Sequence, residues 1–199
     1  MSGSFPTSPI SNGINITSNQ TTIVSTAING RRQVRQLQNQ RWSMTVSFPP
    51  MTRTNFAPIF AFINSQRGRK ESFTYTPPLI DDALGTETGS VLVNGVHAVG
   101  DTTIAMDAFA GDGAGRFKAG DFLKFASHDK VYMVVSDVTS SSNAATVTIE
   151  PPLTTALADN SAVTYDSVPF TVALKNDVQE FQIGQDALFR YELDFIEVL

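Results

Sequence analysis

The chain has 199 residues, of which 41% are hydrophobic and 17% charged, so it is long enough to bury a sizeable core. It contains no cysteine and only two histidines, which excludes disulfides, thiolate metal sites and cysteine nucleophiles. The N-terminus lacks the basic and apolar regions of a signal peptide, and no apolar run approaches the roughly 18–20 residues that cross a bilayer. We therefore expect no membrane insertion.

The charge is divided unevenly along the chain. Residues 1–80 carry eight Lys and Arg against one Glu, a net charge of +7, whereas residues 81–199 carry six basic and eighteen acidic side chains, a net charge of −12. Such an asymmetry favours a basic surface that meets acidic groups, and a second copy of the same chain can supply them. Head-to-tail contacts between copies can close into rings.

Positive charge is concentrated just before the single tryptophan. Four arginines cluster there: Arg31, Arg32, Arg35 and Arg41. The residues that follow alternate between apolar and polar types, which is typical of a strand with one buried face. The predicted core residues of this strand are Trp42, Met44, Val46 and Phe48.

A helix is predicted near residues 54–67, because apolar side chains recur there at the i, i+3, i+4 and i+7 positions of one face. This stripe comprises Phe56, Ile59, Phe60 and Ile63. Gly68 suits the left-handed position that often follows a helix. A second basic group, near the helix C-terminus where the helix dipole favours cations, comprises Arg67, Arg69 and Lys70.

The rest of the chain is predicted to be β structure. Phe73 and Tyr75 share one face of a short strand, and residues 81–168 are short β-type runs separated by Gly, Asp, Ser and Asn turns. The closing segment contains a strand whose apolar face comprises Phe189, Tyr191, Leu193 and Phe195, with Glu192 and Asp194 on the opposite face.

The predicted fold class is therefore mainly β. We expect a β-sandwich with one flanking α-helix, built from residues 1–80 and the closing strands at 169–199. This first domain is discontinuous, because an acidic, small barrel-like β-domain is inserted at 81–168. Domain termini often lie close together, so such insertions are readily accommodated.

No catalytic motif is present: the chain has no G-x-S-x-G elbow, no H-E-x-x-H and no G-x-x-x-x-G-K-[ST] loop. We therefore predict no enzymatic activity, no cofactor, and no catalytic, cofactor-binding or metal-ligating residues. The glycine-rich residues 111–121 are predicted to be a flexible surface loop, with calcium binding left open. His97 and His128 are predicted to be surface or turn residues.

The order of these parts resembles the distal-tail and minor-tail (baseplate-ring) proteins of tailed bacteriophages. The strand "NQRWSMTVSFPPMT" and the helix-to-strand segment "FAPIFAFINSQRGRKESFTYTPP" carry the resemblance, as do the middle segments "VNGVHAVGDTTIAMD" and "KVYMVVSDV" and the closing "RYELDFIEV". The family's pattern around the helix C-terminus is matched by Gly68, Glu71, Phe73, Pro77 and Pro78.

This resemblance implies a structural virion protein that forms a ring, commonly six-fold, at the far end of the tail. Its partners would be further copies of itself, the tail tube, and baseplate or tip hub proteins, with DNA only passing through the lumen. It would be located in the virion tail after assembly in the host cytoplasm. The arginine-rich segment before Trp42 has no counterpart with an assigned role in the family.

The candidate functional site is a contact between subunits made by basic residues. We expect seven of them to face acidic groups of a neighbouring subunit: Arg31, Arg32, Arg35, Arg41, Arg67, Arg69 and Lys70. Alternatives are a tail tube or tube-initiator protein, a nucleic-acid binder acting through the arginines, and a glycan-binding adhesion module of a tail tip. A glycan platform needs clustered exposed aromatic side chains, and the candidates in the insert are spread along the sequence: Phe109, Tyr132 and Tyr165.

Overall fold

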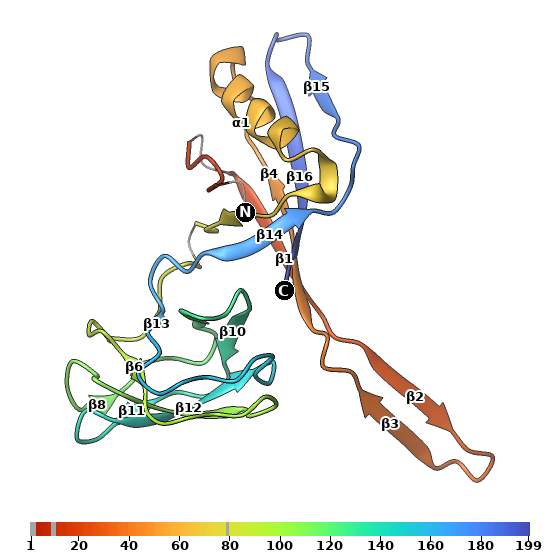
Figure 1. Cartoon of the computed structure of the whole chain (residues 1–199). Coiled ribbons are helices and arrows are strands. Elements are labelled where there is room, and N and C mark those ends of the chain that lie inside the picture. Colours follow the sequence, from red (N-terminus) through yellow and green to blue (C-terminus); the bar gives the residue numbers. More distant parts are fainter. Residues whose placement is uncertain (1–2, 9–10, 79) are drawn as a thin grey trace. The chain divides into compact units, whose positions relative to one another are not determined.

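The structure, a computed structural model, describes residues 3–8, 11–78 and 80–199 (Figure 1). The chain divides into two compact units. Unit 1 comprises the described residues up to Phe5, Phe73–Thr171 and Leu199, and unit 2 comprises Pro6–Ser72 and Val172–Val198. The sequence predicts domain limits at 80/81 and 168/169. These limits describe pieces of the chain that fold independently, which the two compact units do not test, so they remain a prediction.

Unit 2 is built on an antiparallel sheet. Its strands follow the order β1 (Gly13–Asn19), β4 (Arg41–Ser47), β16 (Phe189–Glu197) and β14 (Phe170–Leu174), and β15 (Phe181–Ile183) also pairs with β16. Of β14, the residues Val172–Leu174 belong to unit 2. In β4 the side chains of Trp42, Met44 and Val46 are buried, as its alternating sequence predicts.

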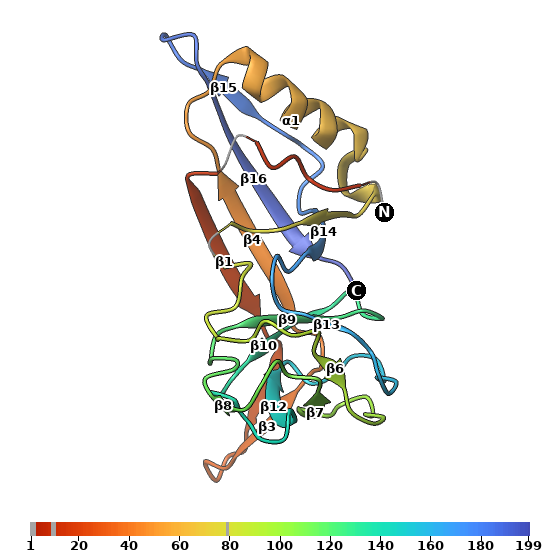
Figure 2. The ribbon, with the colours of Figure 1, turned by 90° about the vertical axis from the view of Figure 1, so that its left-hand side faces the viewer.

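One α-helix, α1 (Arg53–Ser65), packs on this sheet (Figure 2). Its buried side chains are Phe56, Ile59 and Ile63, which lie on one face at helical spacing. The Phe56 ring stacks on Phe189 at 4.7 Å between centroids and meets Tyr191 edge-on at 5.5 Å, so aromatic contacts join the helix to β16.

The helix ends where the sequence predicts a left-handed backbone. Arg67 has φ of 56° and Gly68 has φ of 69°, a conformation that costs glycine little but other residues more. A short 3-10 turn, η1 (Gly68–Lys70), follows. Because α1 already ends at Ser65, the second basic group lies beyond its last turn, and the helix dipole is not what holds it.

Two strands of unit 2 leave the sheet altogether. β2 (Thr22–Thr26) and β3 (Arg32–Gln36) pair only with each other, in register from Thr22↔Gln36 to Thr26↔Arg32. Every residue of both strands is exposed. We call residues 22–36 the arm; it projects from the ends of β1 and β4 (Figures 1 and 2).

Unit 1 contains a small barrel. Its sheet follows the order β13 (Val163–Thr164), β9 (Phe122–Phe125), β10 (Val131–Val134), β12 (Ala145–Glu150), β7 (Thr103–Asp107) and β6 (Leu92–Val93). The two ends of this order meet, because the Val163 N–H donates to the Val91 carbonyl at 3.1 Å and a bridge links Leu92 with Ala162. Such closure removes the free sheet edges.

Smaller elements complete unit 1. β8 (Gly113–Ala114) pairs with β11 (Thr139–Ser140), and β5 (Phe73–Tyr75) is bridged to Ser4 through Thr74. The barrel interior is apolar, with Phe117, Phe125 and Ile104 fully buried. A mainly β fold with one α-helix among the described residues and a barrel-like β unit confirms the predicted fold class.

Twelve of the fourteen predicted core side chains are buried in the structure: Trp42, Met44, Val46, Phe48, Phe56, Ile59, Ile63, Phe73, Tyr75, Tyr191, Leu193 and Phe195. The other two, Phe60 and Phe189, are only partly buried. Both pack against Phe181, at 5.1 and 5.9 Å between ring centroids. Since β15, which carries Phe181, is itself exposed, this end of the aromatic cluster remains accessible to water.

Candidate subunit interface

The arm is a β-hairpin whose turn is set by an Asn-Gly pair. The Gly30 N–H donates to the Ala27 carbonyl, and the Ala27 N–H donates to the Arg31 carbonyl, both at 2.9 Å. The Asn29 side chain accepts from the Arg31 N–H at 3.1 Å. Gly30 has φ of 76°, so glycine supplies the left-handed residue that this kind of hairpin loop needs.

The arm exposes apolar side chains on both of its faces. In the hairpin register Val24 lies opposite Val34 on one face, and Ile23 lies opposite Arg35 on the other. Ile23, Val24 and Val34 are each about half exposed, and Ile28 at the tip is fully exposed. A two-stranded ribbon without a core is marginal in water by itself, so a covering partner would stabilise this one.

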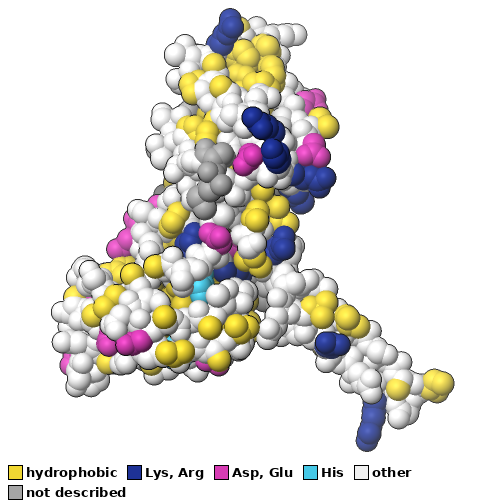
Figure 3. Space-filling view, in the orientation of Figure 1, with side chains coloured by type: hydrophobic (Ala, Val, Ile, Leu, Met, Phe, Trp, Pro, Cys, Tyr) yellow, Lys and Arg dark blue, Asp and Glu magenta, His cyan; other side chains and the backbone are white. Residues whose placement is uncertain are grey.

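The arm also carries unpaired positive charge. Arg31, Arg32 and Arg35 are exposed, and among the described residues none of them has an ion pair. No acidic residue occurs between Gln20 and Gln40. Figure 3 shows basic and hydrophobic side chains side by side along the arm. Arg41 lies at its base, as the first residue of β4.

The second basic group is separate from the arm and is already neutralised in part. Arg69 contacts Asp177 at 3.3 Å, and Lys70 contacts Glu71 at 3.7 Å. The Arg69 N–H also donates to Asp177 at 3.0 Å, and this bond, more than the guanidinium charge, lowers the pKa of the Asp177 carboxyl. The remaining member, Arg67, is exposed. The structure therefore does not bring the seven predicted interface residues together into one cluster.

A groove of about 740 Å³ lies at the other end of the unit 2 sheet, beside β15 and β16. Its apolar lining includes Phe48, Phe181 and Tyr191. Three carboxylates also line it: Glu180, Glu192 and Asp194.

These carboxylates have no cation of their own within the described part of the chain. Asp194 is held by hydroxyl and amide donors, with the Thr45 hydroxyl donating to Oδ1 at 2.6 Å. The single arginine of the groove lining, Arg190, is engaged by Asp186 at 2.8 Å. Glu192 and Asp194 lie on the face of β16 opposite Tyr191, and Phe48 and Tyr191 are buried, so what the groove exposes is mainly its acidic surface.

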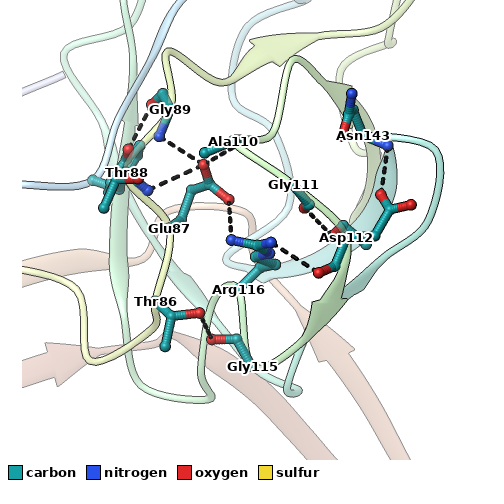
Figure 4. A network of polar contacts seen from close by, with 12 residues as sticks. Thr86, Glu87, Thr88, Gly89, Ala110, Gly111, Asp112, Gly115, Arg116 and Asn143 are labelled. Atoms are coloured by element: carbon teal, nitrogen blue, oxygen red, sulfur yellow. Dashed lines mark hydrogen bonds and ion pairs between the residues drawn. The ribbon is translucent and has the colours of Figure 1, made fainter.

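Unit 1 holds a polar network around Glu87 (Figure 4). Glu87 Oε1 accepts from the N–H groups of Thr88, Gly89 and Ala110 at 2.7–3.1 Å, and Oε2 lies 3.7 Å from Arg116 Nη1. Arg116 Nη2 donates to the Asp112 carbonyl at 2.9 Å. These bonds hold Arg116 of the glycine-rich residues 111–121 against Glu87, and most residues of this segment are exposed, as a surface loop requires. The flexibility of the loop stays a prediction.

Asp112 extends this network to the next loop. Its carboxylate accepts from the Ser142 and Asn143 N–H groups at 2.9 and 2.7 Å. The same two bonds lower the pKa of the Asp112 carboxyl. Asp112 therefore serves to fix a turn.

No group of three or more His, Asp or Glu side chains that could hold a metal ion occurs within residues 3–8, 11–78 and 80–199.

The two histidines have different environments. His97 is partly buried, and its Nε2 accepts from the Ala105 N–H at 3.2 Å. His128 is buried, and its Nδ1 lies 2.9 Å from the Tyr132 hydroxyl. Of the predicted surface or turn position for His128, the surface alternative is wrong, but the turn alternative holds, because the His128 N–H donates to the Phe125 carbonyl at 2.9 Å. Burial lowers the pKa of His128, and a hydrogen bond with the Ala156 backbone only partly opposes this.

The aromatic residues considered for glycan binding lie inside unit 1. Phe109, Tyr132 and Tyr165 are all buried, and the Tyr165 hydroxyl donates to the Gly89 carbonyl. They form no exposed platform.

Sequence reasoning missed the arm and the groove. The Asn29-Gly30 pair between two β-prone runs is the signal that could have revealed the arm. The groove has no comparable signal, because its lining comes from residues 47–50, 176–182 and 190–194.

Residues 84–168 match the family model of the B domain of distal tail protein pb9. The match covers most of the predicted insert and confirms the resemblance to phage distal tail proteins. No curated protein matches the chain. Within the described residues, no helix is both long and apolar enough to cross a membrane.

Proposed function

We propose that this chain, which resembles phage distal tail proteins, is a ring-forming component of a phage tail tip that joins the tail tube to the distal hub. The observation that carries the proposal is the match of residues 84–168 to a distal tail protein domain, which supports a structural role in a phage tail. Its place is then the virion tail, and its partners are other tail components. Assembly would take place in the host cytoplasm.

Ring formation is supported by the features of unit 2. The arm exposes apolar side chains and unpaired arginines, while the carboxylates of Glu180, Glu192 and Asp194 in the groove of the same unit form no ion pair among the described residues. The basic and apolar surface of the arm therefore complements the acidic surface of the groove on the same chain, as a heterologous contact between copies requires. The ring we propose is a hexamer of this chain around a lumen through which DNA passes.

Two other functions make different predictions about the arginines. A nucleic-acid binder would use the arm on phosphates, and its binding would weaken steeply with salt. A tail tube or tube-initiator protein would also assemble through the arm, but into stacked rings.

Charge reversal on the arm tests the proposal. We expect Arg32→Glu together with Arg35→Glu to weaken self-assembly, measured as molar mass by light scattering at low and high salt. Exposed ion pairs contribute about 0–1 kcal/mol each, which is why two are reversed together. Both residues are exposed, so each monomer should stay folded.

The matched control is Arg53→Glu together with Lys118→Glu, which changes the net charge equally at exposed sites off the arm. It should assemble like the parent. If the arm variant assembles normally but loses a salt-sensitive DNA binding that the parent has, the ring contact is wrong and the phosphate function replaces it.

A further inference from the structure

We propose that the tip of the arm of one copy inserts into the acidic groove beside β15 of the next copy. The tip is the turn at residues 27–31 together with Arg32, and the groove is the one lined by Phe181, Tyr191 and Glu192. This inference rests on the proposed ring assembly. It names the surface of the neighbouring copy that the arm contacts.

The tip and the groove of one chain lie at opposite ends of unit 2. The arm leaves the sheet at the pair Asn19↔Arg41, whereas the groove begins at the other end of β4, where Ser47 pairs with Glu192. β4 has seven residues, so its ends lie about 20 Å apart at roughly 3.3 Å per residue. The arm projects further away (Figure 1), so a copy does not fill its own groove and the contact must be heterologous.

The charges of the two surfaces complement each other. The tip presents Arg31 and Arg32, which have no ion pair among the described residues. The groove presents Glu180 and Glu192, likewise without a cation in the described ranges. Because the tip brings several cations to a partly enclosed acidic surface, their attraction is less screened than that of isolated surface pairs.

The apolar parts of the two surfaces also complement each other. Ile28 in the turn is fully exposed, and the exposed apolar residues that line the groove are Val178 and Phe181. A groove of about 740 Å³ has the volume of a small-molecule site, so it can take the few side chains of a turn but not the whole ribbon. In this contact Ile28 covers Val178 and the exposed part of Phe181, while the arginines reach the carboxylates.

The absence of cysteine allows a direct test with the full chain. One batch carries Ile28→Cys at the tip and another carries Val178→Cys at the groove rim. Both side chains are exposed, so neither substitution removes core packing. The batches are mixed, allowed to assemble, and treated with a short bismaleimide. The control mixture replaces the groove variant with Val96→Cys, an equally exposed valine of unit 1.

We expect a covalent dimer of the tip and groove variants, and none in the control mixture. We also expect Arg31→Glu with Arg32→Glu to weaken assembly about tenfold, and Glu180→Lys with Glu192→Lys in the partner copies to restore it. Rings that form without this cross-link, and without rescue by the reversed groove, would overturn the tip-to-groove contact but leave the ring. A chain that stays monomeric at every concentration would overturn the proposed ring as well.

Discussion

Truncation of Phe56 should destabilise unit 2 more than any other single change in α1. Its ring is 4% exposed and contacts Phe60, Phe181, Phe189 and Tyr191 at 4.7–5.5 Å between centroids. Removing a buried phenylalanine ring costs about 3–5 kcal/mol, because apolar burial is lost and a cavity remains. With a urea dependence of about 1.5 kcal/mol per M, Phe56→Ala should lower the unfolding midpoint by about 2–3 M.

Fluorescence of Trp42 is the assay, since this only tryptophan is buried in β4 of unit 2 and therefore reports on that unit. Phe60→Ala is the matched control. Phe60 is the same residue type on the same helix but is partly exposed, so its loss should cost only about 1–2 kcal/mol. If Phe56→Ala shifts the midpoint no more than Phe60→Ala does, the packing of α1 described above is wrong.

Glu87→Ala should destabilise unit 1 by about 3–5 kcal/mol, because it leaves Arg116 and three backbone N–H groups without their buried acceptor; a thermal melt with an unchanged midpoint would contradict this. The pKa of His128 is lowered in the folded chain, so the unfolded chain binds the proton more readily, and stability should fall as the pH drops below about 6.5. His128→Asn should flatten that part of the pH profile, and an equally steep loss in the variant would assign the effect to other groups. Replacing residues 81–168 by a short Gly/Ser linker should leave a folded remainder with a native Trp42 emission spectrum, because the Val168 N–H donates to the Asp81 carbonyl and the ends of the segment are adjacent. Random-coil circular dichroism of both the shortened chain and the excised segment would show that the two parts share one core.

The parts of the fold that sequence predicted are those in which burial is periodic along the chain. The segment from Trp42 to Phe48, which includes most of β4, alternates in sequence, and the stripe of α1 recurs at helical spacing, so each pattern indicates which face is covered. Even in α1, the pattern predicted that Phe60 is a core residue, whereas it is only partly buried. Its exposure depends on β15, which is distant in sequence.

Other features depend on contacts that no local pattern encodes. Glu87 and Arg116 are separated by a long stretch of chain, and His128 is buried by the packing of the barrel. The arm lacks a buried face, so it gives no amphipathic signal, although its arginines were noticed for their charge. Charge could therefore indicate a surface of interest, but not its shape or the groove that complements it.

The proposed function requires copies of this chain to form a closed ring. Electron microscopy of the purified protein at low salt tests it most directly, because a ring and its central lumen are visible without any partner. We predict rings of uniform diameter with a central hole, which become fewer in Arg32→Glu with Arg35→Glu and are retained in the Arg53→Glu, Lys118→Glu control. Single particles of monomer size at all protein concentrations, or open filaments in place of rings, would contradict it.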